Sequence, residues 1–129
     1  PQISPQTVTI AASYPGASAE TLSRTVAAPI EQKLQGLDNL MYFSSTSSSN
    51  GSLSITVTFD ITSDPDMNTV NVNNRVKQAE PSLPEIVRKL GITVEKRSSN
   101  ILQLVTLVAD PTRYNKLFLS KQNRLYKNF

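Results

Sequence analysis

The chain has 129 residues and a formal net charge of +3, and it contains no cysteine, histidine or tryptophan. These absences exclude a disulfide framework, thiolate or imidazole metal ligands, and every Ser-His or Cys-His catalytic arrangement. The length fits one domain, with room for a fragment of a second.

The positive charge is concentrated at the C-terminal end. Residues 113–129 hold five basic and no acidic residues, whereas residues 1–112 hold eight basic and ten acidic residues, a net charge of −2. The basic balance therefore belongs to the tail and is a poor reason to propose nucleic-acid binding by the domain. No apolar run approaches the roughly 20 residues of a membrane span, and no signal peptide is visible.

The first predicted elements are a strand and an amphipathic helix. Residues 7–14 alternate, with Val8 and Ile10 on one face. Ser18 is a plausible N-cap, and Pro29 is expected to bend the following helix near Thr25 before Gly36 ends it. The apolar stripe of this helix steps by four, four, four and three residues: Leu22, Val26, Ile30, Leu34 and Leu37.

A hairpin follows, with Asn50-Gly51 as a strong turn signal that favours type I′ geometry. The arm after the turn alternates cleanly. Leu53, Ile55, Val57 and Phe59 share one face, and Ser52, Ser54, Thr56 and Thr58 share a hydroxyl-lined opposite face. The arm before it, Tyr42 to Ser48, is rich in serine, and we interpret it as solvated.

A second helix is predicted from Pro65 to Ala79, because Asp64 is a good N-cap and proline is favoured at the first helical position. Val72, Val76 and Ala79 form its apolar stripe, with Met67 at one edge. Four asparagines, poor helix formers, suggest either a specific polar interface or, more commonly, a solvated face: Asn68, Asn71, Asn73 and Asn74.

Pro81 should stop this helix, and a short helix from Glu85 to Leu90 closed by Gly91 precedes a strand at 92–98. The order strand, helix, strand, strand, helix, strand predicts an α+β, ferredoxin-like split βαβ unit (βαββαβ) over residues 1–98. Residues 99–129 then open a second, incomplete unit with the strand ILQLVTLV. Its partial helix is expected within residues 114–129, with Leu117, Phe118 and Leu125 as apolar positions.

Catalytic signatures are missing from the sequence. The glycines occupy turn or cap positions rather than a phosphate-binding loop. Asp64 and Asp66 are a close carboxylate pair, but helix capping explains them better than acid/base chemistry. Along the last strand of the unit, Glu95 and Arg97 should share a face while Lys96 points away. We therefore expect no enzyme, no cofactor and no metal.

Three stretches carry a family resemblance: SYPGASAET, GLDNLMYFSS and NVNNRVKQAEPSLP. With their surroundings they closely resemble the first periplasmic porter segment of resistance-nodulation-division (RND) multidrug efflux transporters of the AcrB/MexB type. The likeness covers about residues 1 to 120 essentially without gaps, and these motifs are long and specific. It ends in a basic segment, KQNRLYKNF, that departs from the family pattern.

The resemblance implies positions that line a substrate pocket for hydrophobic or amphiphilic drugs. On the strands and at the crossing that follows them, these are Ala11, Ser44, Ser54, Thr56, Thr93, Glu95, Ser99 and Ile101. Ser54 stands where a glutamine can occur in the family, and Ile101 where a phenylalanine can occur. Losing that aromatic removes stacking area, which would change the substrate range.

The resemblance also gives the asparagine-rich helix a position at the central pore of a homotrimer. The candidates for contact across the threefold axis are Asn68, Asn71, Asn74, Arg75 and Gln78. The implied partners are a periplasmic adaptor and an outer-membrane channel, with this segment on the periplasmic side of the inner membrane. Without transmembrane proton-relay groups, the 129 residues are not expected to transport alone.

Two other classes stay open. A free-standing ferredoxin-like adaptor or nucleic-acid module could use the basic tail, although the sheet offers no aromatic pair for stacking bases and no nucleic acid is expected. A heavy-metal exporter of the same family would have only Met41 and Met67 as soft ligands, which gives it no support here.

Overall fold

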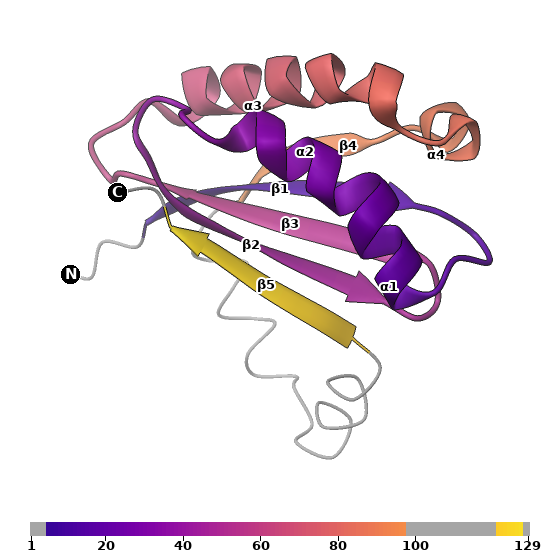
Figure 1. Ribbon diagram of the computed structural model, residues 1–129. Coiled ribbons are helices and arrows are strands. Elements are labelled where there is room, and N and C mark those ends of the chain that lie inside the picture. The colour runs from indigo at the N-terminus through magenta and orange to yellow at the C-terminus, as the bar shows by residue number, and fades with distance from the viewer. Residues whose placement is uncertain (1–4, 98–120, 128–129) are drawn as a thin grey trace.

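The computed structural model describes residues 5–97 and the strand Lys121–Lys127. Five antiparallel strands form one sheet in the order β4-β1-β3-β2-β5, and the helices all cover one face of it (Figure 1). The first four strands have the arrangement of a ferredoxin-like split βαβ unit, so the predicted fold class is confirmed.

The strands β1 (Gln6–Ser13), β2 (Leu40–Ser48), β3 (Ser52–Phe59) and β4 (Thr93–Arg97) alternate between a helix-covered face and an open face. Register fixes which residues share a face, because directly paired residues in an antiparallel sheet lie on the same side. Val8 pairs with Val57 and Ile10 with Ile55, as their alternation in the sequence predicts.

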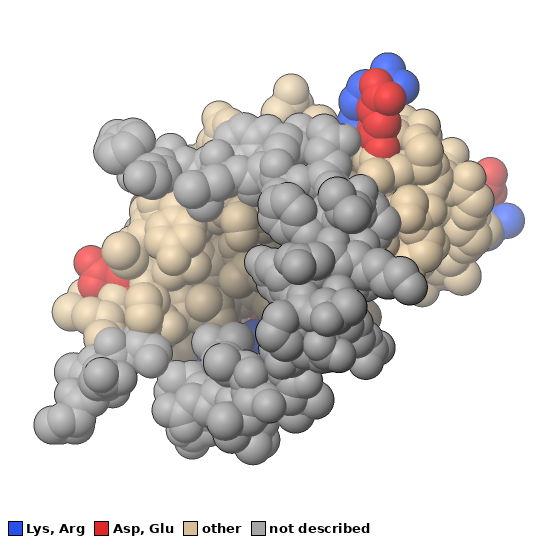
Figure 2. Space-filling model, turned by 90° about the horizontal axis from the view of Figure 1, so that it is seen from below, with Lys and Arg blue, Asp and Glu red and all other residues tan. Residues whose placement is uncertain are grey.

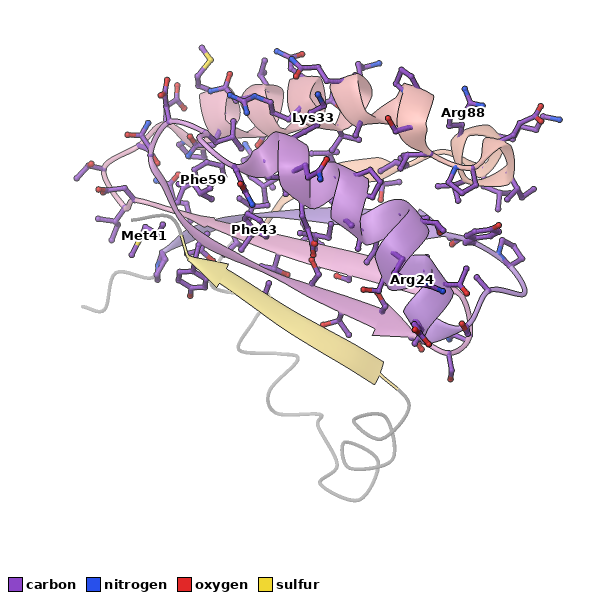
Figure 3. All side chains as sticks on the ribbon, in the orientation of Figure 1. Arg24, Lys33, Met41, Phe43, Phe59 and Arg88 are labelled. Carbon is purple, nitrogen blue, oxygen red and sulfur yellow. The ribbon has the colours of Figure 1, made fainter. Side chains whose placement is uncertain are left out.

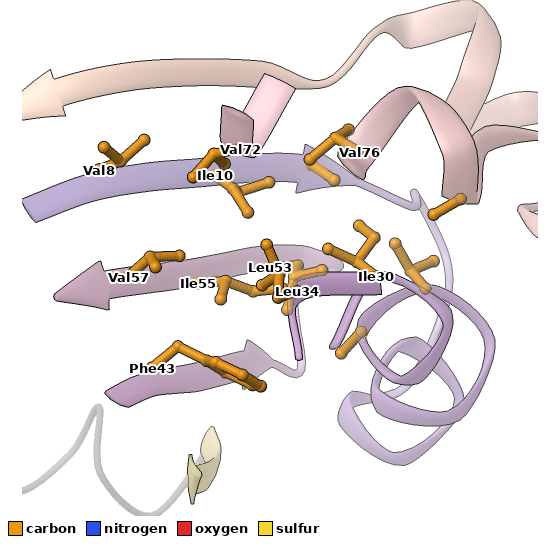
Figure 4. Close-up of a cluster of buried hydrophobic side chains, with 14 of the residues drawn as sticks. Val8, Ile10, Ile30, Leu34, Phe43, Leu53, Ile55, Val57, Val72 and Val76 are labelled. Carbon is orange, nitrogen blue, oxygen red and sulfur yellow. The ribbon is translucent and has the colours of Figure 1, made fainter. Parts of the chain in front are cut away.

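The core lies between the covered face of the sheet and two helical segments that lie side by side on it, Ala19–Leu34 and Pro65–Leu90. Figure 4 shows the β1 and β3 side chains beneath Val72 and Val76 of one helix and Ile30 and Leu34 of the other. Phe43 and Phe59 supply the aromatic bulk, and both lie between the sheet and the helices (Figure 3). The core is otherwise aliphatic, in keeping with the small aromatic content of the chain.

The first helical segment is interrupted in the middle. α1 (Ala19–Leu22) passes into the π-helical turn η1 (Ser23–Ala27) and then into α2 (Ala28–Leu34). Ser18 caps α1 as predicted, because its hydroxyl accepts a hydrogen bond from the Thr21 N–H. The disturbance expected near Thr25 takes the form of this π turn, which ends two residues before Pro29. Proline has no backbone N–H and cannot donate a helical hydrogen bond.

The second helical segment begins and ends close to the predicted helix boundaries. α3 (Pro65–Ala79) begins with Asp64 as N-cap, whose carboxylate accepts from the Asp66 N–H. The 3₁₀ turn η2 (Glu80–Ser82) contains Pro81, and α4 (Glu85–Leu90) ends at Gly91 with a positive φ of 89°. Among the described residues, no helix is both long and apolar enough to span a bilayer.

The β2–β3 turn differs from the expected type I′ geometry. Only Gly51 has a positive φ, and its N–H donates to the Ser48 carbonyl, which defines a three-residue hairpin loop rather than a two-residue one. A Cβ at Gly51 would lie 2.5 Å from the Tyr14 carbonyl oxygen. Both the backbone conformation and this close approach therefore require glycine.

The C-terminal segment corrects another expectation. Residues 121–127, predicted to continue a helix, form β5 (Lys121–Lys127), which pairs with the outer edge of β2. The unpaired backbone of an edge strand readily accepts a further strand, and here this overrides the weak helical pattern. The expected strand after Ser99 and the apolar positions Leu117 and Phe118 lie outside the described residues.

Candidate functional surfaces

The open face of the sheet carries most of the residues that the resemblance implies for substrate contact. Two cross-strand rows follow from the register. One runs through Thr93, Ala11, Ser54 and Thr46, and the next through Glu95, Thr9, Thr56 and Ser44. Six positions expected to line a pocket, from four different strands, therefore lie together on one surface.

This surface is uncharged over much of its area. Ala11, Ser54, Thr93 and Glu95 are exposed, whereas Ser44 and Thr56 are half-buried. In Figure 2, which views the molecule from the side of the open face, most of what is visible outside the grey residues is neither acidic nor basic. Ser99 and Ile101, the two remaining candidates, lie outside the described residues.

The outward side of α3 forms a second polar surface. Asn74 and Gln78 are exposed and Asn71 is half-buried, while Val72 and Val76 on the same helix are buried. These three amides lie at i, i+3 and i+7 and so occupy one stripe of the helix. They form a strip of hydrogen-bonding groups at the outer surface of the molecule.

Asn68 does not share this surface. Only 2% of the residue is exposed, and its side-chain amide donates to the Ser63 hydroxyl at 2.8 Å. Its position four residues before Val72 places it on the buried stripe, where it fixes the loop that enters α3. The sequence-based assignment of Asn68 to a subunit contact thus conflicts with its burial.

Arg75 has an intramolecular role that its sequence position did not indicate. Its Nη1 donates to the Lys33 carbonyl at 2.6 Å and to the Gln35 carbonyl at 3.2 Å. These carbonyls lie at the C-terminal end of α2, where helical backbone acceptors have no partner within the helix. Arg75 therefore connects α3 to the C-terminal end of α2, beside the polar strip of α3.

A buried polar pair lies under α2, and the sequence pattern did not predict it. The Ser45 hydroxyl donates to Glu31 Oε2 at 2.5 Å, and Glu31 and Ser45 are 3% and 1% exposed. Ser23 and Ser47 are buried as well. The interpretation of the β2 arm as solvated is therefore wrong for Ser45 and Ser47, which lie on the helix-covered face. Glu31, four residues after the buried Ala27, lies on that helix's inward stripe, and this spacing was the available signal.

An exposed ion pair joins the edge strand β4 to α3. Lys96 Nζ lies 2.6 Å from Asp66 Oδ1, and this hydrogen bond and charge raise the pKa of Lys96 above its ordinary value. Beside the pair, an open groove of about 390 Å³ is lined by Asp66, Thr69, Val70, Asn73, Val94 and Lys96. Within residues 5–97, no three acidic side chains gather in a way that could hold a metal ion.

These features define a small α+β domain with an open sheet face and a polar strip on α3. The family model described as "AcrB/AcrD/AcrF family" matches residues 1–126. The chain therefore belongs to the AcrB/AcrD/AcrF family of RND multidrug efflux transporters, as the resemblance implied.

Relatives from two genera agree with this assignment. The chain is 48% identical to multidrug resistance protein MdtF of Escherichia coli K12 over 116 residues, which is 90% of this chain and 11% of MdtF. It is 49% identical to multidrug export protein AcrF of the same strain over 110 residues, 85% of this chain and 11% of AcrF. For the toluene efflux pump membrane transporter TtgB of Pseudomonas putida, the identity is 46% over 110 residues, 85% of this chain and 10% of TtgB. The chain thus spans about a tenth of the length of these relatives.

Proposed function

We propose that this chain serves as the first periplasmic porter segment of a proton-driven RND multidrug efflux transporter. The observation that carries the proposal is the 46–49% identity, over 85–90% of the chain, to proteins named as a multidrug resistance protein, a multidrug export protein and a toluene efflux pump membrane transporter. In this role the segment binds substrate and contacts the other subunits, and it catalyses no reaction. Transport would need the membrane part of the pump.

The open face is the proposed substrate surface. Its rows of hydroxyls and small side chains, from Ser44 through Thr56 to Glu95, offer a few adaptable hydrogen-bonding groups on a broad sheet. Sites that accept many hydrophobic or amphiphilic compounds combine apolar area with a small number of such groups. Ser99 and Ile101 would extend this surface beyond β4.

The outward strip of α3 is the proposed contact with two further copies around a threefold axis. Asn71, Asn74 and Gln78 can exchange hydrogen bonds with the same residues of neighbouring subunits or with water along a pore. Arg75 would support the strip by anchoring α3 to α2 rather than by crossing the axis. The assembled pump would stand in the inner membrane, with this segment on the periplasmic side beside an adaptor and an outer-membrane channel.

A chimera tests the proposal directly. The matching 116-residue segment of MdtF would be replaced by the one from this chain, and the chimera expressed in a strain lacking its own multidrug pumps. We expect drug resistance and dye efflux above the empty vector, with unaltered MdtF as the positive control. A chimera present in the membrane at normal level but without efflux would contradict the proposal.

The same chimera tests the α3 strip through Asn74→Leu. We expect a loss of efflux and of trimer in detergent, while the free energy of unfolding of the isolated chain changes by less than about 0.5 kcal/mol, as is usual for an exposed position. Asn73→Leu is the matched control, because Asn73 faces the groove beside β4 instead. Parallel losses of folded protein and efflux in Asn74→Leu would show that the residue is merely structural.

A further inference from the structure

The tip of the β2–β3 hairpin holds a chemically reactive pair of residues. Asn50 is the only asparagine of the chain that precedes a glycine, and it is exposed. The backbone nitrogen of the following residue can attack an asparagine side chain, and glycine leaves this nitrogen unhindered because it has no Cβ. Asparagine is accordingly among the residues that limit the thermal lifetime of proteins. The pair therefore has a second property besides its preference for turns.

Two hydrogen bonds fix the geometry of the pair. The Asn50 Oδ1 accepts from the Ser52 N–H at 3.0 Å, and the Gly51 nitrogen lies within the ring of atoms that this bond closes. A donor at this oxygen also stabilises the negative charge that develops there when the side-chain carbon Cγ is attacked. The Gly51 N–H donates to the Ser48 carbonyl at 3.0 Å, which keeps the nitrogen from attacking while the bond lasts. Breaking the Gly51–Ser48 bond is therefore the step that precedes attack.

That step needs only a local opening of the hairpin tip. Hydrogen bonds at the end of a hairpin open at a lower free energy than those in the middle of a sheet, because fewer neighbours hold them. Asn50 and Ser52 are exposed, although Gly51 is buried against Tyr14. The core side chains of β3, which begin at Leu53, need not move. We therefore expect the reaction to proceed in the folded chain.

The surroundings of Gly51 leave no room for a longer main chain. Its carbonyl accepts from the Tyr14 N–H at 2.8 Å, and a Cβ at Gly51 would lie 2.5 Å from the Tyr14 carbonyl oxygen. That oxygen in turn accepts from the Ala17 N–H at 3.1 Å, just before α1. A shift of Gly51 would therefore release the hairpin tip from the segment that leads from β1 into α1.

We propose that Asn50 is a site of spontaneous covalent modification whose isoaspartyl product detaches the hairpin tip from Tyr14. The Gly51 nitrogen bonds to Cγ, the bond from Cγ to Nδ2 breaks, and ammonia leaves with the proton that the Gly51 nitrogen gives up. Water then opens the cyclic imide. Opening at Cγ gives aspartate, whereas opening at the main-chain carbonyl carbon gives isoaspartate, in which the chain runs through Cβ and Cγ. This site is independent of the proposed transport role.

The first experiment follows the folded 129-residue chain during incubation in mildly alkaline buffer. Mass spectrometry of proteolytic peptides measures the replacement of amide by hydroxyl, and methylation by protein L-isoaspartyl methyltransferase with labelled S-adenosylmethionine detects isoaspartate. We expect the rate at Asn50 to exceed that at Asn39 several-fold, with isoaspartate among the products. Asn39 is the internal control, because it is exposed and lies in a turn but precedes Leu40. Asn50→Gln should abolish the isoaspartate signal of this peptide, since the longer side chain closes a ring far more slowly.

A second variant tests whether local opening is sufficient. Ile55→Ala removes a buried side chain away from the tip and lowers global stability. The rate at Asn50 in this variant should stay close to that of the parent, because the tip opens without the core. A rate that rises in proportion to the unfolded population would overturn the proposal, since the reaction would then belong to the unfolded chain.

The structural consequence is measured by hydrogen exchange on the isoaspartyl chain after chromatographic separation. The amides of Tyr14 and Gly51 should lose their protection, while amides in the middle of β1 and β3 retain it. Asn50→Asp is the matched control, because it adds the same charge without the extra main-chain carbon and can still accept from the Ser52 N–H. It should keep the protection of Tyr14.

Two further outcomes would overturn the proposal. One is a loss of amide at Asn50 no faster than that at Asn39, or one that yields aspartate alone. The other is an isoaspartyl chain in which Tyr14 is as well protected as in Asn50→Asp, because the added carbon would then leave the contact of the hairpin tip intact.

Discussion

The two faces of the sheet use the same strands for different purposes. On the covered face, β3 contributes Leu53, Ile55 and Val57, each buried against the helices. On the open face, the intervening residues of the same strand are hydroxyl-bearing, and Ser54 is exposed while Thr56 is half-buried. Stability is thus concentrated on one side and capacity for contact on the other.

This separation means that the contact surface can change without much cost to the fold. A substitution on the open face alters which compounds or partners fit, since few core contacts depend on it. The covered face is not entirely apolar, because it holds the Glu31–Ser45 pair beneath α2 and the buried Ser47. Ser45 of that pair belongs to β2, the strand with which β5 pairs.

The largest expected effect comes from deleting buried volume on the covered face. Ile55→Ala should lower the free energy of unfolding by about 2–5 kcal/mol, because a fully buried side chain is lost and a cavity remains. Thr56→Ala, the adjacent residue on the open face, should change it by less than about 0.5 kcal/mol. Denaturant unfolding measures both free energies. Similar decreases for the two variants would show that the covered face does not contribute more to stability than the open face.

A smaller effect is expected within β2, where the two faces look alike in sequence. Ser45→Ala should cost about 1–3 kcal/mol, because it leaves the buried Glu31 carboxylate without its hydroxyl donor. Ser44→Ala removes the same group from the open face and should lie within about 0.5 kcal/mol of the parent. Equal free energies of unfolding for the two variants would show that the Glu31–Ser45 hydrogen bond contributes nothing to stability.

The boundaries of the fold were predictable where the signals are local. Asp64-Pro65 marks the start of α3, Gly91 ends α4, and strict alternation identifies β3, since each depends on backbone chemistry within a few residues. The hairpin loop was misjudged because the two-residue geometry that Asn50-Gly51 favours competes with a three-residue one. Contact between Tyr14 and Gly51 bears on that choice, and this contact is not local.

The candidate surfaces were less predictable, since polar residues do not reveal from alternation alone which face is covered. Serines fill both faces of β2, so nothing in the pattern distinguished the buried Ser45 from Ser44. Asn68 and Arg75 were grouped with the α3 strip by composition, but their partners Ser63 and Lys33 lie on other elements. The six described pocket candidates fell on one face because strand register follows from the fold class, whereas their role came only from the family resemblance.

The smallest effect concerns the edge of the sheet opposite β5, where β4 is held to α3 by an exposed ion pair. Asp66 raises the pKa of Lys96 above the ordinary 10.5, chiefly through their hydrogen bond and then through its charge. A lysine pKa that is higher in the folded state means a contribution to stability that is complete below about pH 10.5. It is lost as the pH rises through the higher folded pKa. The difference in free energy of unfolding between the parent and Lys96→Gln should therefore be level from pH 7 to 10 and shrink above that.

Arg97→Gln is the matched control for this titration, because it removes a cation from the neighbouring position of β4 and arginine stays charged throughout the range. Its difference from the parent should not depend on pH in this window. Asp66→Asn should abolish the alkaline dependence attributed to Lys96, and added salt should weaken it, because both groups are solvent-exposed. A parent–Lys96→Gln difference that stays constant up to pH 12 would mean that the ion pair does not hold this edge, and that β4 depends on Val94 and its pairing with β1 alone.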